Sequence, residues 1–189
     1  KDPLNVRLIL EDYEDNFGIP MVEGCRLDYY PNVEVGHWQH RNTYINRKGS
    51  LKNIWLHNFT DDRRFEQIWK KPQHYLEEMI KNDAQVWFGC DFSTFTNYPL
   101  PVSIYNVYRS RFIARMWELG GIYCIHPVQW GDYSLDNYTF DTLPKGISVS
   151  VHAVGIPFED WRRGFDKMLE VCEPYSVFLY SNKKFAENV

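Results

Sequence analysis

The chain has 189 residues, which suits one well-buried domain, because domains commonly contain roughly 100–200 residues. Its 44% of hydrophobic residues is ordinary for a globular protein, whereas 17% of aromatic residues is high. The net charge of -4 argues against wrapping of duplex DNA, and no run approaches the roughly 20 apolar residues of a membrane span. With no apolar leader at its start, we expect a soluble protein, without a membrane partner, in the cytoplasm of a bacterium or an infected host cell.

The first part of the chain, residues 1–52, is rich in turn-forming residues and shows no sustained periodicity. Turn-forming clusters lie at residues 12–18, 29–32 and 46–50. We therefore expect an irregular N-terminal lead-in that packs on the main domain. One short helix over residues 4–12 and one or two strands are expected within it.

From residue 53 onward, short runs rich in β-branched and aromatic residues alternate with amphipathic stretches. About five strands are expected, at 53–58, 85–91, 121–126, 147–153 and 176–180. Such alternation is typical of a mainly parallel sheet with crossover helices. We expect residues 53–189 to form this α/β core, either as an open doubly wound sheet, which we favour, or as a partial β/α barrel.

Three helical stretches separate these strands. Residues 61–81 have helical spacing that Pro72 splits in two, and 104–119 carries one apolar stripe that ends at Gly120. The third stretch spans 158–171, whereas the link from 130 to 146 shows no convincing helix.

In a parallel sheet, the loops after the strands converge and carry the binding site, so the polar residues there are candidates. Asp91 closes an apolar strand and could ligate a metal, act as a base or anchor a ligand hydroxyl; equally, it could cap the following turn. Asp61 and Asp62 stand where N-caps stand, but with Asp91 they could form a carboxylate site for a divalent cation. Apart from such a divalent cation, the sequence indicates no cofactor.

Other polar residues near the strand ends extend this candidate site. His126 is a candidate acid or base, as is His152, although a strand-end histidine is commonly just a hydrogen-bonded residue. His37 and His40 lie three residues apart in the lead-in, which is weak evidence for a metal. The candidate ligand-binding residues are Asn58, Ser93, Arg109, Arg111 and Trp130. The two arginines would hold phosphate, or they would instead form a solvated helix face.

Several known site patterns are absent from the sequence. The four cysteines are scattered without a CxxC pair, which disfavours a zinc or redox site. There is also no phosphate-binding GxxxxGK[ST], no GxGxxG after a strand, no GxSxG and no HExxH. Classical nucleoside triphosphatases, dinucleotide oxidoreductases, serine hydrolases and zinc proteases of the HExxH class are therefore excluded.

Three segments carry a family resemblance: NFTDDRRFEQIWKKPQHY at 58–75, GCDFSTFTNYP at 89–99 and YNVYRSRFIARMWELGGIYCIHPVQW at 105–130. The chain resembles the family called domain of unknown function 4417, found in bacteria, their phages and mobile elements. That family usually has Pro before the Asp-Phe-Ser block, where this chain has Cys90, but Asp91 and Ser93 keep their places. The resemblance implies a phage or mobile-element setting and no established activity.

Two functions follow from these patterns, and whether the protein is an enzyme stays open. In the first, it binds and perhaps processes a phosphate-bearing ligand, a nucleotide or a single-stranded nucleic acid, at the strand ends, with Trp130 stacked on a base. In the second, it is a non-enzymatic protein that binds and modulates a host protein through exposed aromatic residues. A cleft lined by Asp91, Arg109 and His126 would favour the first; burial of these residues in ion pairs beside a flat aromatic patch would favour the second.

Overall fold

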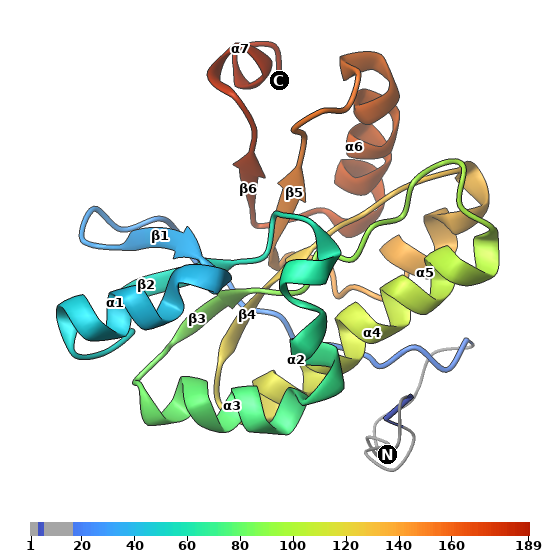
Figure 1. The fold of residues 1–189 in the computed structure, drawn as a ribbon. Helices are drawn as coiled ribbons and strands as arrows, with labels where there is room; N and C mark the ends of the chain where they lie inside the picture. Colours follow the sequence, from blue (N-terminus) through green and yellow to red (C-terminus); the bar gives the residue numbers. More distant parts are fainter. Residues whose placement is uncertain (1–3, 6–16) are drawn as a thin grey trace.

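The computed structural model describes residues 4–5 and 17–189, and its centre is a sheet of six parallel strands (Figure 1). The strands are β1 (Glu34–His37), β2 (Ile54–His57), β3 (Val86–Phe88), β4 (Tyr123–Pro127), β5 (Ser148–His152) and β6 (Ser176–Tyr180). Each strand pairs with the next one along the chain. Every crossover therefore steps in the same direction, as in a β/α barrel, whereas a doubly wound sheet reverses its strand order.

Seven α-helices are present in the described residues: α1 (Arg41–Lys48), α2 (Glu66–Lys70), α3 (Pro72–Lys81), α4 (Leu100–Leu119), α5 (Asp136–Phe140), α6 (Phe158–Cys172) and α7 (Lys183–Ala186). Short 3₁₀ turns are η2 (Trp38–His40), η3 (Asp62–Arg64) and η4 (Tyr133–Leu135). Local chemistry sets several ends. Pro72 occupies the first position of α3, where its missing N–H costs nothing, and Gly49 ends α1 in the left-handed region at φ 79°.

The outer face of the sheet is covered by helices. Because side chains alternate along a strand, Leu56, Trp87 and Val149 point outward and join the main core with residues of α2 to α6. At its centre Trp87 of β3 meets Trp117 of α4 with ring centroids 4.0 Å apart. Such an aromatic pair adds about 0.5–1.5 kcal/mol beyond its buried area.

The inner face of the sheet is concave and carries a second apolar cluster. Trp55 of β2, Phe88 of β3 and Ile125 of β4 are buried there, with Phe178 of β6 packed against them. The ring centroids of Trp55 and Phe178 lie 5.8 Å apart, although three strands separate β2 from β6. The sheet is therefore curled into a half-barrel.

The segment before β1 crosses the amino-terminal ends of β5 and β6. The backbone oxygen of Cys25 accepts from Ser148 N at 2.7 Å, and that of Leu27 accepts from Ser176 Oγ at 2.9 Å. Tyr30 then places its ring edge-on to Trp55 at 6.2 Å. This end of the half-barrel is thus closed by the chain itself, which leaves the carboxyl-terminal end as the place for a site.

The predicted α/β class with a mainly parallel sheet is confirmed, with six strands instead of about five. The additional strand, β1, lies within the lead-in, where one or two strands were expected without a position, and the link over 130–146 contains η4 and α5. Our preference for an open doubly wound sheet was wrong, because the strand order never reverses. The helix expected over residues 4–12 falls, beyond Leu4 and Asn5, outside the described residues. None of the described helices has the length and apolar character that crossing a bilayer demands.

Candidate functional site

Three of the six strands end in a histidine: His37 in β1, His57 in β2 and His152 in β5. Two residues before these, Val35, Trp55 and Ser150 occupy the same side of their strands, and Trp55 belongs to the inner cluster. β6 ends in Tyr180, which packs against that cluster. The carboxyl-terminal end of the concave face is therefore lined by aromatic and imidazole rings.

Phe59, in the loop after β2, fills the centre of this end. Its ring centroid lies 5.4 Å from His57, 5.1 Å from Tyr180 and 5.7 Å from His152. The rings of His37 and His57 approach to 4.2 Å. We call the set His37, His57, Phe59, His152 and Tyr180 the mouth.

A carboxylate stands beside the mouth. Asp91, which follows β3, places Oδ2 3.4 Å from Nδ1 of His152, with 12% and 31% of the two side chains exposed. A carboxylate in this position can orient the imidazole of His152. The pair has the residue types needed to accept a proton from a bound molecule and to return it.

Burial keeps the other two histidines of the mouth neutral. It lowers the pKa of His57 to about 4, helped by the nearby His37 and His152, and it lowers the pKa of His37 as well. The backbone N–H of Phe59 donates to Nδ1 of His57 at 3.3 Å, so neutral His57 carries its proton on Nε2. In His37, Nδ1 is buried and has no hydrogen-bond partner among the described residues.

The predicted acidic residues do not gather into one cluster. Asp61 is exposed, caps η3 and pairs with Arg63 at 2.6 Å; hydrogen bonds from Arg63 lower the pKa of Asp61 to about 2. Its neighbour Asp62 instead accepts from Ser93 Oγ at 3.0 Å, and burial raises the pKa of Asp62. Within 4–5 and 17–189, no three His, Cys, Asp or Glu side chains are grouped as metal ligands.

The predicted arginines are bound to their own chain. Arg109 pairs with Glu66 at 2.9 Å and lies 3.7 Å from the centroid of the Phe92 ring. Arg111 is fully buried and donates to the carbonyl oxygens of Pro127 and Thr139, and burial lowers its pKa to about 10.

The remaining predicted residues lie around the mouth rather than in it. His126 points to the helical layer and pairs with Glu118 at 2.8 Å, and Trp130 packs on Trp161 of α6 at 5.7 Å. Asn58 is buried and donates from Nδ2 to the backbone oxygen of Gly89. Asp91, Arg109 and His126 therefore do not line one cleft.

The structure thus brings Asp91 together with a set of rings of which the sequence predicts only a part. The sequence indicates a role for His152, but it indicates none for His57, Phe59 or Tyr180. The available signal was the inward position of each residue at a strand end, which follows from alternation once the strand is placed.

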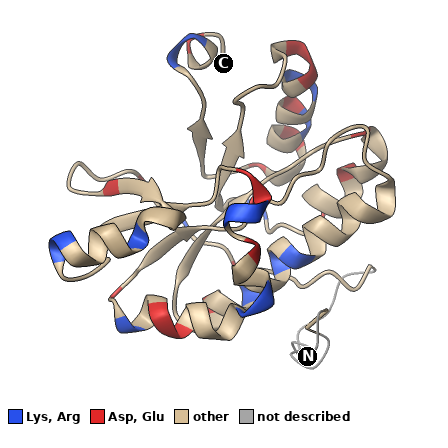
Figure 2. Cartoon of the chain, viewed as in Figure 1, with Lys and Arg blue, Asp and Glu red and all other residues tan. Residues whose placement is uncertain are grey.

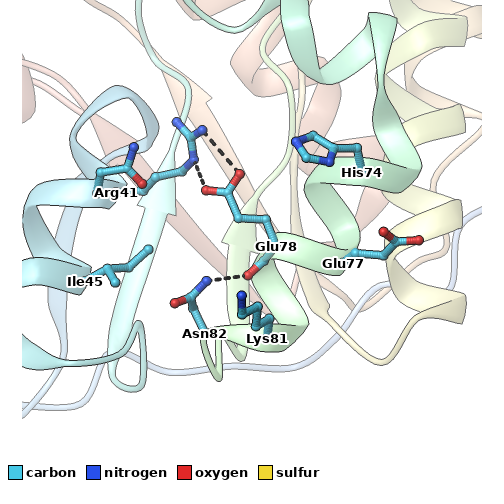
Figure 3. A pocket seen from close by; sticks show the side chains of 8 residues that line it. Arg41, Ile45, His74, Glu77, Glu78, Lys81 and Asn82 are labelled. Carbon is cyan, nitrogen blue, oxygen red and sulfur yellow. Dashed lines mark hydrogen bonds and ion pairs between the residues drawn. The ribbon is translucent and has the colours of Figure 1, made fainter.

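A separate surface hollow of about 530 Å³ lies between α1 and α3, and Figure 3 shows its side chains. Arg41 donates to Glu78 at 2.7 Å across it, and Asn82 donates to the backbone oxygen of Glu78. The hollow is of mixed charge and is formed by helices, not by strand ends. It is not the better candidate, because its central charged groups, Arg41 and Glu78, already satisfy one another.

Comparisons with known proteins support the family resemblance. Residues 11–188 match the family described as "Domain of unknown function (DUF4417)". The chain is 28% identical over 196 aligned positions to the "Gene 1 protein" of Mycobacterium phage L5, which covers 100% of this chain and 81% of that protein. Against the "Gene 1 protein" of Mycobacterium phage D29 it is 27% identical over 139 positions, covering 71% of this chain and about half, 51%, of that protein. No solved structure matches.

Proposed function

Since the chain belongs to the DUF4417 family, whose description assigns no activity, we propose that it is a phage or mobile-element protein that binds a nucleotide or a single-stranded nucleic acid at the mouth. The observation that carries the proposal is the convergence of His37, His57, His152, Tyr180 and Phe59 at the carboxyl ends of parallel strands, beside Asp91. Ligands of parallel α/β sheets, barrels included, bind at this end of the strands.

The chemistry of the mouth suits a base more than a phosphate. Aromatic and imidazole rings stack on nucleobases of any sequence, and each such contact is worth about 1–3 kcal/mol. A neutral histidine has one donor and one acceptor, and because Nδ1 of His57 already accepts from Phe59, His57 offers the donor Nε2–H to a base. Because His57 and His37 are kept neutral by burial, they would not serve as the principal phosphate ligands.

Exposed cations that follow β2 and β6 along the chain would hold the phosphate. Arg64 follows β2 and donates to Gln39 at 2.6 Å, while Lys183 and Lys184 follow β6 in α7. Figure 2 shows these basic positions on η3 and on α7. We assign the phosphate to them rather than to Arg109 and Arg111, which are already bound to groups of the chain.

A thermal-shift screen tests the proposal directly. The probes are nucleoside monophosphates, cyclic nucleotides and short single-stranded oligonucleotides, each with and without a divalent cation. A ligand present at 100 times its Kd stabilises the folded state by about 2.7 kcal/mol and raises the melting temperature. A response to mononucleotides indicates a small-molecule site, and a response to oligonucleotides alone indicates strand binding.

Tyr180→Ala and Tyr175→Ala form a matched pair of variants, because Tyr175 immediately precedes β6 and Tyr180 ends it, but only Tyr180 lies in the mouth. We expect Tyr180→Ala to weaken binding at least about tenfold, from the loss of one stacking ring, and Tyr175→Ala to leave it unchanged. If the ligand is processed, Asp91→Asn should retain binding and lose turnover. No response to any probe, or equal responses in both tyrosine variants, would contradict the proposal.

A second function is favoured by a different observation. Phe95 and Tyr98 are 56% and 38% exposed and meet edge to face at 5.2 Å in the loop before α4. Arg109 is held in an ion pair with Glu66 and buried His126 bonds to Glu118, and residues engaged in this way favour a non-enzymatic protein that binds a host protein. The test is the double variant Phe95→Ser and Tyr98→Ser, which should abolish co-purification of a host protein while the folded state and nucleotide binding persist.

A further inference from the structure

Phe59 has an unusual position for a loop residue. It lies outside every strand, yet only 6% of it is exposed, and its ring contacts His57, His152 and Tyr180 from three different strands. It also reaches Phe88 of the inner cluster at 6.2 Å. A single loop side chain thus covers the carboxyl-terminal end of the concave face.

The backbone around Phe59 is fixed on both sides of that residue. Asn58 is fully buried and donates to the backbone oxygen of Gly89, and Asp61 caps η3. Between them, the backbone N–H of Thr60 donates to the oxygen of Asn58 at 2.8 Å, which makes Phe59 the apex of a three-residue turn. A rotation confined to Phe59 would move its ring without disturbing β2 or η3.

Two buried polar atoms on the inner face have no hydrogen-bond partner in the described part of the chain: Oγ of Ser150 and Nδ1 of His37. Ser150 is fully buried in β5, and it lies on the same side of that strand as Ser148 and His152. Ser148 shows the contrast, because its Oγ bonds with Leu27 and Ser176. Buried polar atoms are nearly always hydrogen-bonded, so the two unpaired ones call for a partner.

We propose that Phe59 is a place-holder for the base of the ligand, an inference that rests on the proposed function of the mouth. On binding, the phenyl ring turns outward and a nucleobase takes its place against His57 and Tyr180. The edge of the base then hydrogen-bonds to Ser150 Oγ and His37 Nδ1, which a phenyl ring cannot satisfy. The site therefore selects a planar ring with in-plane donors and acceptors, and Ser150 is a specificity-determining residue.

Phe59→Ala distinguishes two roles of the phenyl ring: affinity for a nucleotide should rise if the ring occupies the place of the base, and fall if the ring contacts the bound base. Calorimetric titration with nucleoside monophosphates, and with inorganic phosphate as the probe without a ring, should show Phe59→Ala binding at least about threefold more tightly than the unaltered protein, because the competing closed form is removed. Phe59→Leu keeps most of the buried apolar volume and should show a smaller gain in the same direction. Tyr123→Ala, at the exposed start of β4 and so at the opposite end of the sheet, is the control and should change nothing.

Ser150→Ala supplies the second measurement. Because Ser150 Oγ has no partner in the described residues, its removal should leave the melting temperature of the free protein unchanged or higher, while weakening nucleotide binding about threefold to tenfold. Binding that weakens in Phe59→Ala as it does in Tyr180→Ala would overturn the place-holder inference and leave the proposed function standing. Binding by Phe59→Ala alone, without binding by the unaltered protein, would support the inference. Absence of binding in every form would overturn both.

Discussion

The buried His57 makes a quantitative prediction about acid stability. Its pKa is lowered from 6.5 to about 4 in the folded protein, mainly by burial, so between these values the unfolded chain binds more protons than the folded one. Stability is therefore greatest above the unfolded pKa and is lost as the pH falls toward the folded pKa. Since one pKa unit corresponds to about 1.4 kcal/mol, the whole loss is roughly 3 kcal/mol, of which roughly 2 kcal/mol falls between pH 7 and pH 5.

The assay is urea unfolding at several pH values between 7 and 5 on the unaltered protein and on His57→Gln. Glutamine keeps an acceptor for the backbone N–H of Phe59 but does not titrate. We expect the variant to show a pH dependence that is smaller by roughly 2 kcal/mol over this range. His74→Gln, at an exposed position of α3, is the control and should keep the full dependence. Equal slopes for the unaltered protein and His57→Gln would refute the reasoning.

Three further predictions concern residues that support the mouth from outside. Arg109→Met breaks the pair with Glu66 and should lower the free energy of unfolding by about 1–3 kcal/mol, with ligand affinity unchanged by calorimetry. Glu118→Gln weakens the bonds to His126 and to the backbone N–H of Gly24, and urea unfolding should show a loss of about 2 kcal/mol, whereas exposed Glu170→Gln should cost nothing measurable. Gly131→Ala would place Cβ 2.5 Å from the backbone oxygen of Thr94, so we expect a lower melting temperature. A melting temperature equal to that of the unaltered protein would contradict this close contact.

The strand-and-helix alternation was predictable because each unit carries its own local signal. The expected strand at 147–153 corresponds to β5 at Ser148–His152, and the expected helix at 158–171 corresponds to α6 at Phe158–Cys172. β1 was expected only as an unplaced strand of the lead-in, because its four residues, EVGH, contain a single large apolar side chain and a glycine. It is a strand because β2 offers it a hydrogen-bonding edge, which no local pattern can reveal.

The arginines of α4 show why candidate ligand residues were harder to place. A cluster of arginines near strand ends has the same sequence whether it faces a ligand or a neighbouring helix. In the structure, Arg109 donates a hydrogen bond to Glu66 of α2, which lies 43 positions away in the sequence. Arg109 therefore faces a neighbouring helix. Contacts between distant elements of this kind depend on the curl of the sheet and have no local signal.

The position of a histidine along its strand determines whether it can reach a ligand, because side chains alternate between the two faces of the sheet. In β4 the inner cluster contains Ile125, so His126, the next residue, must point to the helices, where it meets Glu118. In β2 the inner cluster contains Trp55, so His57, two residues later, must point inward. A strand-end histidine in a parallel half-barrel is thus a candidate for the site only when it lies on the side of its strand that faces the concave inner face. That rule selects His57 over His126, and the melting-temperature response of His57→Gln and His126→Gln to the same nucleotide probes would test it.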